Sequence, residues 1–169
     1  AFEIAPEKSL LIGKALKILA DKAGIYGMVG GQVVDVASCG IGLDEGMLNF
    51  IYELKTGALI ESSMMIGALL AGADEAELEK VQKIASDVGI AFQIQDDILD
   101  VTSTTEELGK PVHSDEKNEK TTYVTLKGLE KATADVEAVS QEALELLSGL
   151  DRENAYLTQL IQELIHRKK

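Results

Sequence analysis

Proline, the residue that interrupts helices most strongly, occurs at only two positions of this chain, Pro6 and Pro111. Elsewhere apolar residues recur every three or four positions, and the strict alternation of a half-buried strand is almost absent. The sequence therefore predicts an all-α protein of about seven or eight helices. The expected helices cover Glu7–Lys22, Ile25–Ser38, Asp44–Lys55, Gly57–Ala71, Asp74–Val101, Glu119–Leu126, Leu129–Leu147 and Arg152–Arg167.

The composition fits a single domain over residues 1–169, with 46% apolar and 27% charged residues. No apolar run approaches the roughly 20 residues that cross a bilayer, so we expect no membrane span. The net charge of −13 argues against nucleic acid as a partner, because such a partner requires a basic surface. The single cysteine, Cys39, excludes an internal disulfide and fits a reducing, cytoplasmic location.

The segment Asp74–Val101 carries the most informative pattern. At about 100° per residue, one narrow stripe of this helix collects three carboxylates, an amide and two small residues: Asp96, Asp97, Asp100, Gln93, Gly89 and Ser86. Most of the remaining surface is apolar, whereas a helix on a protein surface has a broad polar face. The pattern predicts a buried helix whose polar stripe faces a cavity.

Three carboxylates on a buried stripe repel one another unless a cation neutralises them. Oxygen ligands without nearby His or Cys suit Mg²⁺, so we expect Asp96, Asp97 and Asp100 to bind this metal. The alternative is a solvated acidic face at a helix end. An EF-hand is excluded because Thr105 occupies the position that requires glycine, and a ferritin-like site because Glu163–His166 is the only Glu-x-x-His pair.

Two further segments contain groups suited to binding a diphosphate. Residues 27–32, GMVGGQ, place three glycines in an apolar helix, which indicates close helix packing or close approach of a ligand. Gln32 ends this motif, and Asp35 follows it on the same helix. Lys55, Thr56 and Gly57 are expected at a helix break, where a lysine could meet a phosphate.

Segment 102–120 is polar, contains Gly and Pro, and has no periodicity, so it is expected to form a mobile active-site loop. The alternative is a plain surface connection. Lys110 and Lys120 lie in this segment just beyond the aspartates. Each lysine alone would be assigned to a solvated surface, but together they supply the positive charge that a magnesium–diphosphate cluster needs.

Taken in order, the motifs GMVGGQ with Asp35, KTG, FQIQDDILD, GKP and a downstream KTTY resemble those of the trans-isoprenyl diphosphate synthases, or polyprenyl synthetases. The nearest likeness is to bacterial farnesyl diphosphate synthases, also called geranyltranstransferases. The motifs run from Gly27 to Tyr123, and the likeness covers essentially the whole chain. The resemblance implies an isoprenoid-synthase-type helical bundle, usually a homodimer, that uses Mg²⁺ and takes isoprenoid diphosphates as substrates.

The resemblance also implies a reaction and a set of metal ligands. Metal and lysine charges would stabilise the departing diphosphate of an allylic substrate, and isopentenyl diphosphate would attack the resulting carbocation. Asp96 would be a direct Mg²⁺ ligand, and Asp97 and Asp100 would bind metal directly or through water.

Other roles implied by the resemblance concern the substrate. Three lysines would contact the allylic diphosphate: Lys55, Lys110 and Lys120. Three polar residues would line the site near the reacting carbons: Thr56, Gln93 and Gln32. Asp35 would orient Lys55 or a water. The expected catalytic residues are Lys55, Thr56, Gln93 and Asp96.

Two features depart from the family pattern. The first aspartate-rich motif and the basic isopentenyl diphosphate site are absent. We therefore expect this chain to be the C-terminal half of a synthase, with the N-terminal half as its partner and no turnover without it. His113 occupies a position where the family pattern has glycine, which leaves the placing of Lys110 open. An exposed loop residue is the favoured interpretation of His113.

The sequence leaves open the chain length of the product and the functional class of the protein. Farnesyl diphosphate is the first expectation, and geranylgeranyl or a longer diphosphate is the alternative. A terpene cyclase on the same fold would need an aromatic pocket, but aromatic residues make up only 4% of the chain and tryptophan is absent. A non-catalytic helical subunit is the alternative from another class.

Overall fold

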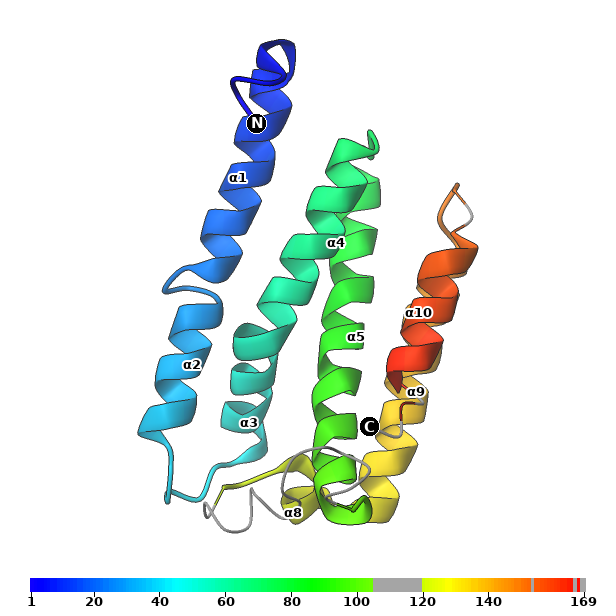
Figure 1. Cartoon of the computed structure of the whole chain (residues 1–169). Coiled ribbons are helices and arrows are strands. Elements are labelled where there is room, and N and C mark those ends of the chain that lie inside the picture. Colours follow the sequence, from blue (N-terminus) through cyan, green and yellow to red (C-terminus); the bar gives the residue numbers. More distant parts are fainter. Residues whose placement is uncertain (105–119, 153, 166, 168–169) are drawn as a thin grey trace.

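The computed structural model describes residues 1–104, 120–152, 154–165 and 167. Within these residues every regular element is a helix, which confirms the all-α prediction (Figure 1). A short 3₁₀ turn, η1 (Pro6–Lys8), precedes the first helix. The further elements are α1 (Ser9–Ala23), α2 (Met28–Ala37), α3 (Glu45–Tyr52), η2 (Glu53–Gly57), α4 (Ala58–Leu70), α5 (Glu75–Thr102), α8 (Tyr123–Lys127), α9 (Leu129–Ser148) and α10 (Ala155–Ile165).

Helix α5 is the centre of the bundle. It packs against α4 on one side and against α9 and α10 on the other, while α1 packs against α4 (Figure 1). The side chains of Ile84, Ala91 and Ile94 on α5 are almost fully buried in the main apolar core. Burial of this apolar surface is the main stabilising contribution to the bundle. The expectation that this segment forms a buried helix is therefore confirmed.

Local capping explains where α5 and α8 begin. The Asp74 carboxylate accepts a hydrogen bond of 2.9 Å from the Glu77 N–H, and the Glu77 carboxylate accepts one of 3.1 Å from the Asp74 N–H. This reciprocal capping box satisfies backbone donors that the first helical turn leaves unpaired. Thr122 and Thr125 form the same arrangement at α8. Consequently α8 begins at Tyr123, later than the expected helix that started at Glu119.

The structure corrects the expectation of a helix break at Lys55, Thr56 and Gly57. Residues Glu53–Gly57 form a π-helical turn, η2, that joins α3 to α4 without interruption. Gly57 serves as a contact point and does not end the helix. A β-carbon built on Gly89 of α5 would lie only 2.8 Å from the Gly57 Cα. Glycine at position 89 therefore lets α5 approach the backbone of η2, and π turns of this kind are frequent at functional sites.

No helix in the described part of the chain combines the length and apolar character needed to cross a membrane.

Candidate functional site

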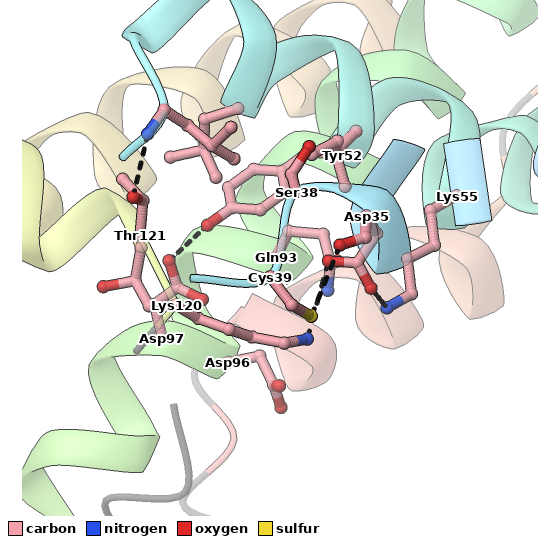
Figure 2. A pocket seen from close by; sticks show the side chains of 14 residues that line it. Asp35, Ser38, Cys39, Tyr52, Lys55, Gln93, Asp96, Asp97, Lys120 and Thr121 are labelled. Carbon is pink, nitrogen blue, oxygen red and sulfur yellow. Dashed lines mark hydrogen bonds and ion pairs between the residues drawn. The ribbon is translucent and has the colours of Figure 1, made fainter. Parts of the chain in front are cut away.

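A pocket of about 140 Å³ lies where α2, α3, η2, α5 and the residues that lead into α8 meet (Figure 2). Its lining brings together six of the residues singled out from the sequence: Asp35, Lys55, Gln93, Asp96, Asp97 and Lys120. Two of these, Asp35 and Lys120, are 85 positions apart in the chain. The fold therefore assembles the expected polar groups from separate elements into one place.

The remaining predicted residues lie elsewhere. Thr56 does not line the pocket, but its hydroxyl donates a hydrogen bond of 3.0 Å to the side-chain oxygen of Gln93. Gln93 does line the pocket. Gln32 is half-buried on α2 and Asp100 is buried near the end of α5, and neither lines this pocket. Lys110, together with His113, lies outside the described residues.

Asp35 connects the two lysines of the pocket. Its Oδ2 accepts a hydrogen bond of 2.6 Å from the Lys55 ammonium, and its Oδ1 lies 3.5 Å from the Lys120 ammonium. Burial raises the pKa of the Asp35 carboxyl, but the hydrogen bond from Lys55 and the charge of Lys120 outweigh burial and lower the pKa overall. Asp35 is therefore ionised at neutral pH, and it holds two cations at the pocket wall.

Asp96 is the most accessible of the three predicted metal ligands, with 37% of its side chain exposed. It lines the pocket, and its Oδ1 lies 3.2 Å from a nitrogen of the Arg167 guanidinium. That guanidinium also stacks 3.7 Å from the centre of the Phe92 ring. Asp96 thus presents a carboxylate to the pocket and also pairs with a guanidinium that is not part of the pocket lining.

Asp97 has a different environment. It is 8% exposed, and its Oδ2 accepts hydrogen bonds from the Tyr52 hydroxyl and from the Tyr123 N–H, the second at 2.6 Å. Among the described residues, no three His, Cys, Asp or Glu side chains form a group that could hold a metal ion. The oxygen ligand at Asp96 suits Mg²⁺, which commonly takes one or two carboxylates and completes its shell with water and substrate phosphate. Mg²⁺ binding accordingly remains a prediction centred on Asp96.

The sequence did not single out Tyr52, whose hydroxyl lies beside the carboxylate stripe. Tyr52 follows the apolar run at Leu48 and Ile51 and is buried with them. A buried tyrosine hydroxyl normally requires a partner, so the residue carried a usable signal. The partner could not be inferred, because Asp97 is 45 residues away in the chain.

An all-helical bundle whose carboxylate helix faces two paired lysines has groups suited to the class of protein that binds a Mg²⁺–diphosphate group. Comparisons with known proteins agree with this class. Residues 8–164 match the family model described as polyprenyl synthetase. The chain belongs to the polyprenyl synthetase family, the trans-isoprenyl diphosphate synthases.

Individual relatives show how much of the family is covered. The chain is 42% identical over 155 residues to geranylgeranyl pyrophosphate synthase 11 of Arabidopsis thaliana, which covers 90% of this chain and 43% of the relative. It is 43% identical over 141 residues to large subunit 1 of a heterodimeric geranylgeranyl pyrophosphate synthase of the same plant. This match covers 82% of this chain and 38% of the relative. Both relatives are named as chloroplastic, so the cytoplasmic location remains a prediction.

Solved structures place the bundle in the isoprenoid-synthase fold, as expected. A geranyltransferase from Helicobacter pylori, complexed with magnesium and isoprenyl diphosphate, matches with a TM-score of 0.79 and 34% identity. The match covers 93% of this chain and 52% of that protein. The chain thus spans about half the length of the relatives it resembles.

Proposed function

We propose that this chain forms the diphosphate-binding half of a Mg²⁺-dependent prenyltransferase that joins an allylic diphosphate to isopentenyl diphosphate. The observation that carries the proposal is the arrangement of Lys55 and Lys120 around Asp35, beside the half-exposed Asp96 in the same pocket. Two ammonium groups and a carboxylate suited to Mg²⁺ match the charge of a metal–diphosphate group.

Each group would contribute to departure of the diphosphate. The two lysine ammoniums would donate hydrogen bonds to its oxygens as negative charge develops on them. Asp96 would hold Mg²⁺, which when bound supplies further positive charge to the leaving group. Gln93, whose side-chain oxygen accepts the Thr56 hydroxyl hydrogen bond, would lie near the allylic carbons.

The product assignment changes when the relatives are considered. Farnesyl diphosphate was the first expectation, but the curated relatives are named mainly as geranylgeranyl diphosphate synthases. Geranylgeranyl diphosphate is therefore the better-supported product, and farnesyl diphosphate becomes the alternative. The farnesyl alternative is supported by solved relatives, which include a geranyltransferase and a putative farnesyl-diphosphate synthase.

We further propose that turnover requires protein beyond these 169 residues. The relatives are about twice as long as the aligned segment, and the chain contains no second cluster of the DDxxD type. The missing carboxylates would come from an N-terminal half. A homodimer is the expected assembly, and a different subunit, as in the heterodimeric relative, is the other outcome to distinguish.

The proposal is tested by supplying this chain with its N-terminal half, labelled isopentenyl diphosphate, Mg²⁺ and each allylic diphosphate, and measuring product chain length. Lys55→Ala or Lys120→Ala is expected to weaken diphosphate binding by about 1.5–3 kcal/mol, roughly 10- to 150-fold, because each removes a charge-assisted hydrogen bond. Lys14→Ala is the matched control, because Lys14 occupies an exposed position of α1. Absence of product with every allylic substrate would favour a non-catalytic subunit.

A further inference from the structure

The buried carboxylate of Asp97 connects three parts of the fold. Its Oδ2 accepts hydrogen bonds from the Tyr52 hydroxyl at the end of α3 and from the N–H of Tyr123, the first residue of α8. The same N–H also lies 3.3 Å from the Tyr52 oxygen. All three residues are buried. Loss of either donor would leave part of a buried charge unsatisfied, so this contact strongly fixes the three groups relative to one another.

The contact restrains the residues that carry Lys120. Tyr123 follows Lys120 by three positions, a distance that an extended chain spans in at most about 11 Å. Between them, the Thr121 hydroxyl oxygen accepts a hydrogen bond of 3.0 Å from the Leu43 N–H. Figure 2 shows the Lys120 side chain extending toward Asp35. The anchor at Tyr123 therefore limits where the Lys120 ammonium can lie.

Asp96 and Asp97 are neighbours with different surroundings. The Asp96 side chain is 37% exposed in the pocket, whereas Asp97 is enclosed by Tyr52 and the start of α8. A residue can affect the site without touching metal if it holds a ligand-binding group in position.

We propose that Asp97 is a positioning residue for Lys120. Through the Tyr52 hydroxyl and the Tyr123 N–H it holds the start of α8, and so keeps the Lys120 ammonium in the pocket beside Asp35. This inference deepens the proposed function and rests on it only in taking a diphosphate as the ligand that Lys120 meets.

The test measures how fast individual lysine amines of the folded 169-residue chain are acylated, by mass spectrometry, in buffer containing EDTA. Without metal, a metal-ligand role of Asp97 cannot contribute. Tyr52→Phe keeps the buried ring but removes the hydroxyl that donates to Asp97, and it is expected to accelerate acylation of Lys120 several-fold. Lys55 pairs with the same Asp35 but lies on η2, so its rate is expected to stay unchanged. Asp97→Asn should give the same selective change.

Equal acceleration at both lysines would show general loosening of the site, and no acceleration at Lys120 would show that its position does not depend on Asp97. Either result overturns the inference. A parallel measurement adds inorganic diphosphate and Mg²⁺ to the wild-type chain, where both lysines are expected to be protected. Lack of protection would contradict the proposed function, while the metal-free comparison of Lys120 with Lys55 would still decide the role of Asp97.

Discussion

Gly31 of α2 lies directly against the backbone of Lys55: a β-carbon built on Gly31 would lie 2.4 Å from the Lys55 nitrogen and 2.8 Å from the Leu54 Cβ. Four residues further along α2, roughly one helical turn, Asp35 meets the Lys55 ammonium at 2.6 Å. The absence of a side chain at one position thus permits the helix contact that places an ion pair in the pocket.

Gly31→Ala is expected to force α2 away from η2 and to lower the free energy of unfolding by about 1–3 kcal/mol, because the added methyl meets backbone and cannot be accommodated by a side-chain rotation. Gly13→Ala is the matched control, since a β-carbon there meets nothing within 4 Å and α1 gains helix propensity. Urea unfolding of the two variants checks the prediction. Equal stability of both would contradict the close contact.

Asp96→Asn is expected to abolish the Mg²⁺-dependent part of diphosphate binding while changing the free energy of unfolding by no more than about 0.5 kcal/mol, as for most partly exposed positions. Asp100→Asn should instead lower the free energy of unfolding and leave the Mg²⁺-dependent part of diphosphate binding largely unchanged. Asp100 is only 3% exposed, and a buried carboxylate depends on its protein partners. Calorimetric titration with inorganic diphosphate, with and without Mg²⁺, together with urea unfolding, separates the two effects. A Mg²⁺-dependent signal that persists in Asp96→Asn would remove Asp96 from the metal site.

Asp87 provides a test of the electrostatics away from the pocket. Burial raises the pKa of Asp87 by more than the hydrogen bond and charge of Lys83 lower it, and the Asp87 Oδ2 has no hydrogen-bond partner among the described residues. The pKa of Lys83 is also raised, chiefly by its hydrogen bond to Asp87. Because Lys83 is more than half exposed, water weakens the stabilisation that its charge gives to the ion pair. The burial of the Asp87 carboxylate therefore determines how the pair affects stability.

A raised carboxyl pKa means that ionisation costs more in the folded than in the unfolded chain. The cost is absent below the unfolded pKa, about 3.9, and complete above the folded pKa. Asp87→Asn is therefore expected to unfold at a higher urea concentration than the wild type at pH 7, and the difference should shrink as pH falls toward 4.

Asp135 is the matched control of opposite sign for Asp87. The hydrogen bond from Lys131 lowers the pKa of Asp135, so its ionised form stabilises the fold above the unfolded pKa and this stability is lost as pH falls. Asp135→Asn should accordingly reduce stability at pH 7. If both variants shifted the urea midpoint in the same direction, burial would not explain the behaviour of Asp87.

Asp74→Ala removes the side chain that caps α5 and is expected to cost about 1 kcal/mol of unfolding free energy, because the Glu77 N–H loses its acceptor. Glu79→Ala, on an exposed position of the same helix, should cost little or nothing. Thermal unfolding followed by circular dichroism compares the two. A similar loss in both variants would point to charge removal and not to capping.

The parts of the fold that depend on local sequence were predictable. The helical period and the Asp74–Glu77 pattern placed the start of α5 within one residue, since capping and periodicity act over a few positions. The π-helical turn was missed because Lys55, Thr56 and Gly57 resemble a helix stop locally. In the structure Lys55 lies against Gly31 and Gly57 lies against Gly89, on helices distant in sequence, and no local pattern reveals these contacts.

The sequence predicted which residues gather at the candidate site, but not which of them contact one another. The polar residues of α5 were found because they interrupt an apolar pattern, and Asp35 and Lys55 because they accompany glycine-rich motifs. That Asp97 turns toward Tyr52 while Asp96 remains accessible could not be read from a helical stripe. Residues 40° or 100° apart on a helix face different neighbours, and tertiary packing decides which neighbours those are.

The π-helical turn has a consequence for how this family can vary over evolutionary time. A π turn contains one residue more than an α turn. Because the extra residue is contained within a single turn, deleting one residue from Glu53–Gly57 would return this turn to α-helical geometry and leave α4 in nearly the same rotation relative to α3, with the same face packed on α1 and α5. Homologous chains should consequently keep the packing of α4 whether the segment between Tyr52 and Ala58 has its present length or is one residue shorter.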